Sequence, residues 1–295
     1  MNSMHSQGEP GTFSTRDGRE LFYMHRVGGA PGAPMVVFEG GMACSRSYWA
    51  PVQVALGARA ASVVYDRCGL GRSAPDPVSR ALSRVVADQG ELLEHLTRRF
   101  DPPGFLLVGH SWGGAIVRAA TTGPAAQRIS GAVLIEPTDE ACDALFTPAM
   151  RRAERIGQFG SSLLARIGVL HLAFRDLLAA MPADARADMR AEGFTPAAMR
   201  TRGAEIETLI DDLYALRGVE RPVPDIPVTI VSGARTSAGM GTEIRAAANA
   251  TNTARSATYP RGRHVLALNS GHAVPVTEPD LVAAEIVRVI GVCCE

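Results

Sequence analysis

Short runs of consecutive apolar residues alternate along the chain with segments in which apolar residues recur at helical spacing. The runs MVVF, SVVY, FLLV, AVLI and VTIV are apolar at every position, which is typical of strands buried on both faces of a sheet. Helical spacing is clear within residues 82–96 and 281–290, the second of which follows a proline at 279 that is typical of a first helical position. We predict strands at residues 21–27, 35–38, 62–65, 105–108, 132–135, 228–232 and 264–268. This alternation predicts an α/β fold built on a mostly parallel, doubly wound sheet.

The alternation is interrupted once, between residues 140 and 221. This stretch is rich in Ala, Leu, Arg and Met, has no strand pattern, and is broken by Pro182, Gly193 and Pro196. We expect it to be a helical cap inserted between two strands, so that residues 1–139 and 222–295 form the core. Its apolar content is typical of a substrate pocket, although the same residues would also pack a cap on a core.

Composition and charge narrow the class of protein. Apolar residues make up 46% of the chain and charged residues 20%, as in globular proteins with a sizeable core. Thirty basic residues balance thirty acidic ones without a basic cluster of useful size, so we expect no nucleic-acid partner. No apolar run approaches the roughly 18 residues of a membrane span, and the polar N-terminus has no signal-peptide core.

The cysteines suggest a reducing, cytoplasmic compartment but no metal site. Five cysteines are odd in number and lack metal-ligand spacing, so we expect reduced thiols in a cytoplasmic protein with no membrane partner. The adjacent pair Cys293-Cys294 has no assigned role, and the oligomeric state is left open.

The segment FLLVGHSWGGAIVRAA, residues 105–120, carries the clearest chemistry. It reads as an apolar strand, then Gly-His-Ser-Trp-Gly, then a helical pattern. In such a nucleophile elbow, a strained strand-to-helix turn exposes the serine, here Ser111. The turn brings backbone segments so close that the positions two before and two after the serine must be small, and here they are Gly109 and Gly113.

With this elbow, three further segments make the chain resemble the α/β-hydrolase superfamily over nearly all of its length outside the insertion. MVVFEGGMACSRSYWAPV is similar to the strand and oxyanion loop of that family, VVYDRCGLGRS to the next strand and turn, and NSGHAVPVTEPDLV to the histidine loop and final helix. The resemblance implies a triad of serine, acid and histidine that works without a cofactor. We expect no metal site, because neither His-Glu-x-x-His nor a paired Cys/His set occurs.

The resemblance also assigns the oxyanion hole and the general base. Many relatives have His-Gly after the first core strand, whereas this chain has Glu39 followed by two glycines. Because the donors are backbone N–H groups, we assign them to Gly41 and Trp112. We expect the Glu39 carboxylate to hydrogen-bond to the loop backbone, and a role as a polar anchor near the pocket is left open. The base falls on His272, in the loop after the last strand.

The remaining histidines are expected to be packed or solvated rather than catalytic. His110 lies beside the serine in the elbow and is expected to point elsewhere. The others are His5, His25, His95, His171 and His264.

The acid is missing from the loop where it is most often found. In this fold the order is serine, acid, histidine, yet IPVTIVSGARTSAGMGT, residues 226–242, contains no Asp or Glu. Glu243 follows only within a predicted helix. The preceding strand is followed by Glu136 and then Asp139, and some α/β-hydrolases, certain lactonases and dehalogenases among them, carry the acid there. We therefore predict Glu136 as the acid, with Asp139 as the alternative.

Together these residues predict a serine hydrolase acting on small carboxylic esters or lactones through an acyl-enzyme. A serine nucleophile argues against epoxide hydrolase and dehalogenase chemistry, which needs a carboxylate. Iminopeptidase, thioesterase and haloperoxidase-like activities share the triad and stay open. From a different class, a non-catalytic small-molecule receptor on the same scaffold also stays open.

Overall fold

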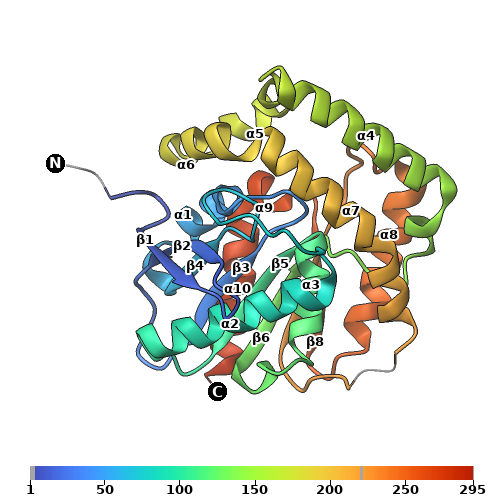
Figure 1. The fold of residues 1–295 in the computed structure, drawn as a ribbon. Coiled ribbons are helices and arrows are strands. Elements are labelled where there is room, and N and C mark those ends of the chain that lie inside the picture. The colour runs from blue at the N-terminus through green and yellow to red at the C-terminus, as the bar shows by residue number, and fades with distance from the viewer. Residues whose placement is uncertain (1–3, 220–221, 295) are drawn as a thin grey trace.

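The computed structural model describes residues 4–219 and 222–294, which form one eight-stranded sheet with helices on both faces (Figure 1). The strands lie in the order β1-β2-β4-β3-β5-β6-β7-β8. The pairs β1–β2 and β2–β4 are antiparallel, and all other neighbours are parallel. The strands are β1 (Glu9–Ser14), β2 (Glu20–Arg26), β3 (Met35–Glu39), β4 (Ser62–Tyr65), β5 (Phe105–His110), β6 (Ile129–Ile135), β7 (Val228–Gly233) and β8 (Gly262–Ala267).

The α-helices fall into two groups. The core helices are α1 (Ala50–Leu56), α2 (Leu82–Phe100), α3 (Trp112–Ala120), α8 (Thr242–Ala257), α9 (Val274–Thr277) and α10 (Pro279–Cys293). The helices between β6 and β7 are α4 (Pro148–Arg166), α5 (Arg175–Ala179), α6 (Ala183–Asp188) and α7 (Pro196–Arg217), with a π-helical turn at Met189–Gly193. Short 3-10 helices occur at Arg46–Trp49, Gly57–Arg59, Ala126–Arg128, Asp143–Phe146 and Leu170–Phe174.

Two hydrophobic layers explain why the inner strands are apolar at every position. In β3, Val36 and Phe38 join a cluster with α1 and α10 on one face of the sheet. Met35 and Val37, which alternate with them, join a cluster with α2 and α3 on the other face. Because successive side chains of a strand point to opposite faces, both faces must be apolar when helices cover both. The central strands of this sheet are therefore buried throughout.

The seven predicted strands are all present, as is the mostly parallel sheet. The eighth strand, β1, was not predicted. Its sequence EPGTFS contains Pro and Gly, which are unfavourable in central strands. As an edge strand paired only with β2, β1 tolerates both residues.

The described residues in regular structure between Ile135 and Val228 are all helical, and Figure 1 shows these helices across one edge of the core. We refer to residues 143–217 as the inserted helices. Residue 221, where the predicted cap ends, lies outside the described residues, and the division into core and cap stays a prediction. Within the described part of the chain, no helix combines the length and apolar character needed to cross a membrane.

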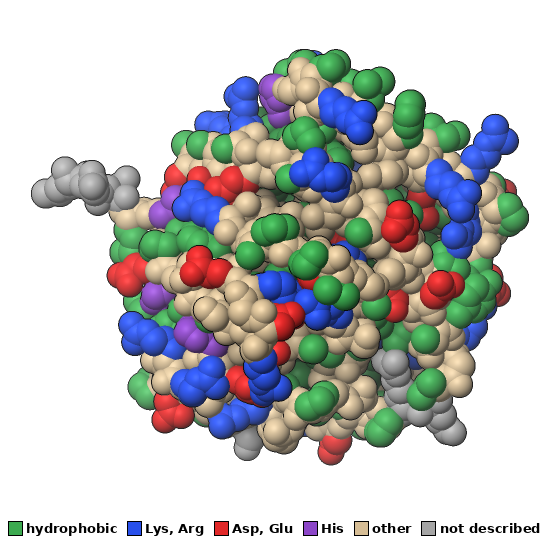
Figure 2. Space-filling view, in the orientation of Figure 1, with side chains coloured by type: hydrophobic (Ala, Val, Ile, Leu, Met, Phe, Trp, Pro, Cys, Tyr) green, Lys and Arg blue, Asp and Glu red, His purple; other side chains and the backbone are tan. Residues whose placement is uncertain are grey.

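The surface in view carries mixed charge. Figure 2 shows basic and acidic side chains interspersed among hydrophobic and other ones, which agrees with the formal net charge of zero.

Candidate active site

Ser111 occupies a strained turn between β5 and α3. Its φ of 55° and ψ of −121° lie outside the usual regions for a residue with a side chain. A Cβ added at Gly109 would lie 2.4 Å from the Gly113 carbonyl oxygen, and one at Gly113 would lie 2.4 Å from the Glu39 carbonyl oxygen. Only glycine fits at these two positions. The turn is thereby fixed by close backbone packing, and the serine is held beyond the end of the strand.

His272 lies in the loop between β8 and α9. Its backbone carbonyl oxygen is 2.8 Å from His110 Nε2. Because a carbonyl can only accept, His110 Nε2 must carry the proton. Burial and the neighbouring His272 lower the pKa of His110 to about 3, so this ring is neutral and keeps that tautomer. Sequence reasoning gave His110 no part in the site, but the structure shows that it anchors the loop of His272.

The imidazole of His272 contacts the carboxylate of Glu136. Glu136 Oε2 lies 3.2 Å from His272 Nδ1. Glu136 directly follows β6 and has a φ of 48°, again unusual for a residue with a side chain. Strained residues cluster at functional sites, and Ala43, Ser111 and Glu136 are three of the four non-glycine residues with positive φ among those described.

Two donors besides His272 hold the Glu136 carboxylate. The Gly233 N–H donates to Oε1 at 2.7 Å, and Arg245 Nη1 lies 2.6 Å from both oxygens. Burial raises the pKa of Glu136, but hydrogen bonds from His272 and Arg245 prevail and lower it. The Glu136 carboxyl is therefore ionised at neutral pH. The loop without Asp or Glu contributes only the Gly233 backbone to this carboxylate.

Sequence reasoning missed Arg245. It lies in the first turns of α8 and is 4% exposed. The helix was predicted, but its register against the sheet was not, so nothing in the sequence showed that this side chain turns inward. A buried arginine needs a carboxylate partner, and Glu136 is the partner that the structure supplies.

Other predicted acids lie elsewhere. Asp139, the alternative acid, accepts hydrogen bonds from Arg255 at 2.7 and 2.8 Å and also binds Arg118. Glu243 is exposed on α8. Of the acids considered, the structure brings only Glu136 into contact with His272.

The predicted oxyanion loop follows β3. A Cβ added at Gly41 would lie 3.2 Å from Ser111 Cβ, so this glycine borders the serine. Trp112 is the first residue of α3, directly after the serine. Within the described residues, the N–H groups of Gly41 and Trp112 donate to no protein acceptor. Ser111 Oγ is likewise not hydrogen-bonded to His272 within those residues.

The prediction for Glu39 was wrong. Its carboxylate is fully buried and contacts side chains rather than loop backbone. It binds the Tyr65 hydroxyl, Arg67 Nη1 at 2.7 Å and Gln89 Nε2 at 2.9 Å. Burial raises the pKa of Glu39, and the adjacent Arg67 only partly offsets this effect. The acidic residue that replaces the usual histidine thus belongs to a polar network behind the loop.

Apolar side chains from the inserted helices reach the neighbourhood of the site. Leu178, Met181 and Met189 form a cluster with Tyr48 and Val276 of the core. The Tyr48 ring lies 5.0 Å from the His110 ring. The inserted helices therefore place buried apolar side chains next to the His110 ring, which contacts the loop of His272.

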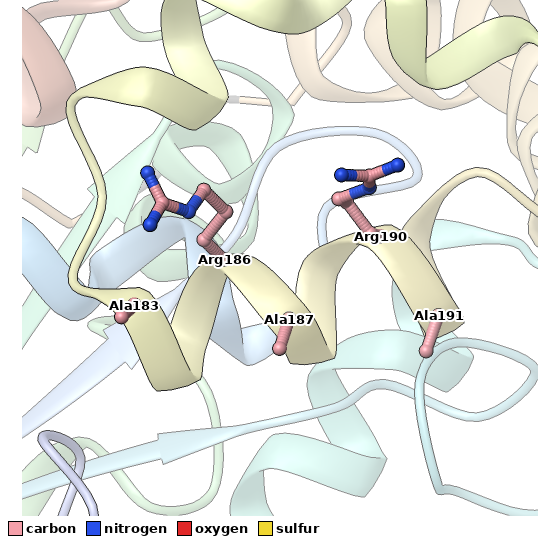
Figure 3. Close-up of a pocket in the computed structure, with 5 residues that line it drawn as sticks. All are labelled: Ala183, Arg186, Ala187, Arg190 and Ala191. Atoms are coloured by element: carbon pink, nitrogen blue, oxygen red, sulfur yellow. The ribbon is translucent and has the colours of Figure 1, made fainter.

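The groove drawn in Figure 3 is a separate feature. It has a volume of about 450 Å³ and is lined by Arg186, Arg190 and three alanines of the inserted helices. None of the predicted site residues lines it. We assign it no part in the chemistry of Ser111.

Comparisons with known proteins agree with the fold. The model of the alpha/beta hydrolase family matches residues 30–285. The uncharacterized protein YqjL of Bacillus subtilis (strain 168) is 31% identical over 134 residues, which cover 45% of this chain and 50% of YqjL. The match thus spans about half the length of this curated relative.

Two solved structures resemble the whole chain. A hydrolase from Pseudomonas aeruginosa PA01 is 23% identical with a TM-score of 0.66, covering 96% of this chain and 99% of that one. The enol-lactonase from Burkholderia xenovorans LB400 is 18% identical with a TM-score of 0.64, covering 95% of this chain and 100% of that one. At these identities the likeness shows a shared fold.

Proposed function

Because the chain belongs to the alpha/beta hydrolase family, we propose that it hydrolyses carboxylic esters or lactones with Ser111 as nucleophile, His272 as base and Glu136 as acid. One observation carries this proposal. The ionised Glu136 carboxylate lies 3.2 Å from His272 Nδ1. His272 itself lies on a loop whose backbone is hydrogen-bonded to His110, the residue before Ser111. A carboxylate at Nδ1 keeps the proton there and leaves Nε2 free to accept one.

In the first half of the reaction, Ser111 Oγ attacks the carbonyl carbon of the substrate while His272 Nε2 takes the hydroxyl proton. The carbonyl oxygen becomes an oxyanion, which the N–H groups of Gly41 and Trp112 stabilise. The bond to the alcohol oxygen then breaks, and His272 returns the proton to that oxygen. An acyl group stays on Ser111.

In the second half, water attacks the acyl carbon and His272 takes the proton of the water. Collapse of this second oxyanion breaks the bond to Ser111 Oγ, which recovers its proton from His272. The products are a carboxylic acid and an alcohol, or one hydroxy acid when the substrate is a lactone. Glu136 stays ionised throughout and stabilises the imidazolium that forms twice.

The position of Trp112 at the start of α3 favours this chemistry. The first N–H groups of a helix have no acceptor within the helix, and the helix dipole adds partial positive charge there. Both effects favour negative charge next to Ser111. This position therefore stabilises the oxyanion of the transition state more than the neutral carbonyl of the ground state.

The neighbourhood favours substrates with an apolar part. Tyr48, Met181 and Leu178 belong to a buried apolar cluster near the histidine loop. An acyl or alcohol chain of an ester that packs against this cluster would bury apolar area. The fold shared with an enol-lactonase keeps lactones among the candidates.

The test is a panel of p-nitrophenyl esters of increasing acyl length, together with lactones and acyl thioesters, run on the wild type and on Ser111→Ala. We expect turnover of esters or lactones by the wild type and loss of all turnover in Ser111→Ala, with an unchanged melting temperature. Triad nucleophiles contribute up to about 10⁶-fold, so residual activity above about 1% would contradict the serine mechanism. Faster turnover of thioesters than of oxygen esters would favour a thioesterase.

A further inference from the structure

Behind the predicted oxyanion loop lies a buried guanidinium that contacts the loop directly. Arg67 is 3% exposed and follows β4. Its Nη1 donates to the carbonyl oxygen of Gly40 at 2.6 Å, and its Nη2 donates to that of Gly41 at 2.7 Å. One side chain therefore fixes two successive peptide groups of the loop.

These contacts determine where an N–H group points. The described chain has no cis peptide bonds, and in a trans peptide the C=O and N–H directions are opposite. Since the Gly40 carbonyl points at Arg67, the N–H of the same peptide unit, which belongs to Gly41, points away from Arg67. Gly41, on the predicted oxyanion loop, lies next to Ser111. Rotation of this peptide by loss of Arg67 would redirect the amide that we assign to the oxyanion.

The guanidinium is itself held by two carboxylates. Glu39 accepts from Nη1 at 2.7 Å, and Glu205 accepts from Nε at 3.1 Å and from Nη2 at 2.9 Å. Both carboxylates are fully buried. Because this geometry uses all of the donating nitrogens of Arg67, the side chain cannot turn without breaking a buried ion pair.

Glu205 does not come from the core. It lies on α7, one of the inserted helices. Its Oε2 accepts from the N–H of Ala43, in the same loop, at 3.1 Å. Ala43 has a φ of 56°, a conformation that a residue with a side chain holds only when its surroundings impose it. The contact with α7 is therefore part of what holds the loop in its strained form.

We propose that Arg67 is a positioning residue that orients the Gly41 N–H toward the oxyanion. Because Glu205 of α7 contacts both Arg67 and the loop, this orientation also requires α7 to be packed in its observed position. The oxyanion hole is then complete only when the inserted helix is in place. This inference rests on the proposed hydrolase function, which it deepens.

The chain offers a matched control. Arg80 is equally buried and also donates to Glu205 Oε1, at 3.1 Å, but it contacts no carbonyl of the loop. Arg67→Met and Arg80→Met thus remove the same group from the same carboxylate. Only the first also removes the guanidinium from Glu39 and the support of the loop.

The experiment compares kcat, KM and inhibition by a trifluoromethyl ketone, measured well below each variant's melting temperature. The ketone forms a hemiketal with the serine and places an oxyanion in the hole, whereas KM reports ground-state binding for a substrate whose acylation is the slow step. Since loss of one oxyanion donor costs about 10²–10³-fold in kcat, Arg67→Met should lower kcat about 10²-fold and weaken the ketone by a similar factor. KM should change little, and Arg80→Met should retain the wild-type kcat and ketone affinity at a lower melting temperature.

Equal losses of kcat in Arg67→Met and Arg80→Met, or unchanged ketone affinity in Arg67→Met, would overturn the proposal. If Arg67→Met does not fold, Glu205→Gln decides. Three guanidinium donors would keep its amide oxygen at Oε1, so its NH₂ group would face the Ala43 N–H and release the loop. We expect lower kcat and weaker ketone binding there, and wild-type values would refute the role of α7.

The proposed function is tested separately in the same series. Labelling of Ser111 by a fluorophosphonate in the wild type, with no activity in Ser111→Ala, would uphold the hydrolase even if the Arg67 and Glu205 variants behaved like the wild type. Absence of labelling and of turnover in the wild type would instead contradict the hydrolase itself.

Discussion

Replacing Glu136 by glutamine changes one oxygen for an NH₂ group at the carboxylate that faces the base. The structure predicts which oxygen is lost. Oε1 accepts from the Gly233 N–H at 2.7 Å and from Arg245 at 2.6 Å, so the amide oxygen should stay there. The NH₂ group then takes the place of Oε2, next to His272 Nδ1.

This orientation leaves His272 in the wrong tautomer. An NH₂ group can only donate, so Nδ1 becomes the acceptor and the proton moves to Nε2, which can no longer take the proton of Ser111. In a serine protease the equivalent change lowers kcat about 10⁴-fold, and we expect a loss of that order in Glu136→Gln. It corresponds to about 5 kcal/mol of transition-state stabilisation.

Stability should fall as well. In the wild type, Arg245 Nη1 lies 2.6 Å from Oε2. In Glu136→Gln an NH₂ group takes the place of Oε2, and the buried guanidinium loses its charged partner. Breaking a buried ion pair costs about 3–5 kcal/mol. Chemical denaturation of Glu136→Gln should therefore show a smaller free energy of unfolding than the wild type.

The assay is kcat/KM on a p-nitrophenyl ester, measured on folded protein, with Asp139→Asn as the control. Asp139 is a buried carboxylate that also binds arginines, but it does not contact His272. Asp139→Asn should lose stability and keep its activity. A folded Glu136→Gln with more than about a tenth of wild-type kcat/KM, against the expected 10⁴-fold loss, would refute the assignment of the acid.

Three further predictions concern the base and the charge of the acid. His272→Ala should lose activity as Ser111→Ala does, whereas His264→Ala, which removes contacts on β8, should mainly change stability; an active His272→Ala would contradict the triad. Arg245→Met should raise the pKa of Glu136, because burial then raises this pKa with one fewer hydrogen bond to lower it, and an NMR titration of the Glu136 carboxyl should show the rise. A Glu136 pKa equal to that of the wild type would show that Arg245 does not lower it. Since the folded-state pKa of Glu136 is lowered, its charge adds stability above the unfolded-state pKa of about 4.3 and this stability is lost as pH falls through the folded-state pKa. The difference in unfolding free energy between the wild type and Glu136→Gln should accordingly shrink on acidification, and a difference independent of pH would contradict this.

The sequence predicted features that follow from local pattern and chain order. Continuous apolar runs located the inner strands, and Gly-His-Ser-Trp-Gly after one of them located Ser111 at the elbow. The absence of any acid from residues 226–242 directed attention to Glu136 one strand earlier, and the structure places its carboxylate at His272 Nδ1.

What the sequence did not predict depends on contacts between distant segments. Arg245 and Glu136 are 109 positions apart, and Arg67 and Glu205 are 138 apart. Each pair forms only after a helix packs in one register on the core, and no periodicity specifies which polar side chain turns inward. Glu39 was misjudged for the same reason, because its partners on β4 and α2 lie beside it only in the folded sheet.

The central claim is that Ser111 becomes acylated during turnover. The wild type and Ser111→Ala are each incubated with a p-nitrophenyl ester, quenched with acid, and examined by intact mass spectrometry and peptide mapping. We expect the wild type to carry the mass of one acyl group on the peptide that contains Ser111, and Ser111→Ala to carry none. A burst of p-nitrophenol release without an adduct at Ser111, or the same adduct in Ser111→Ala, would contradict the claim.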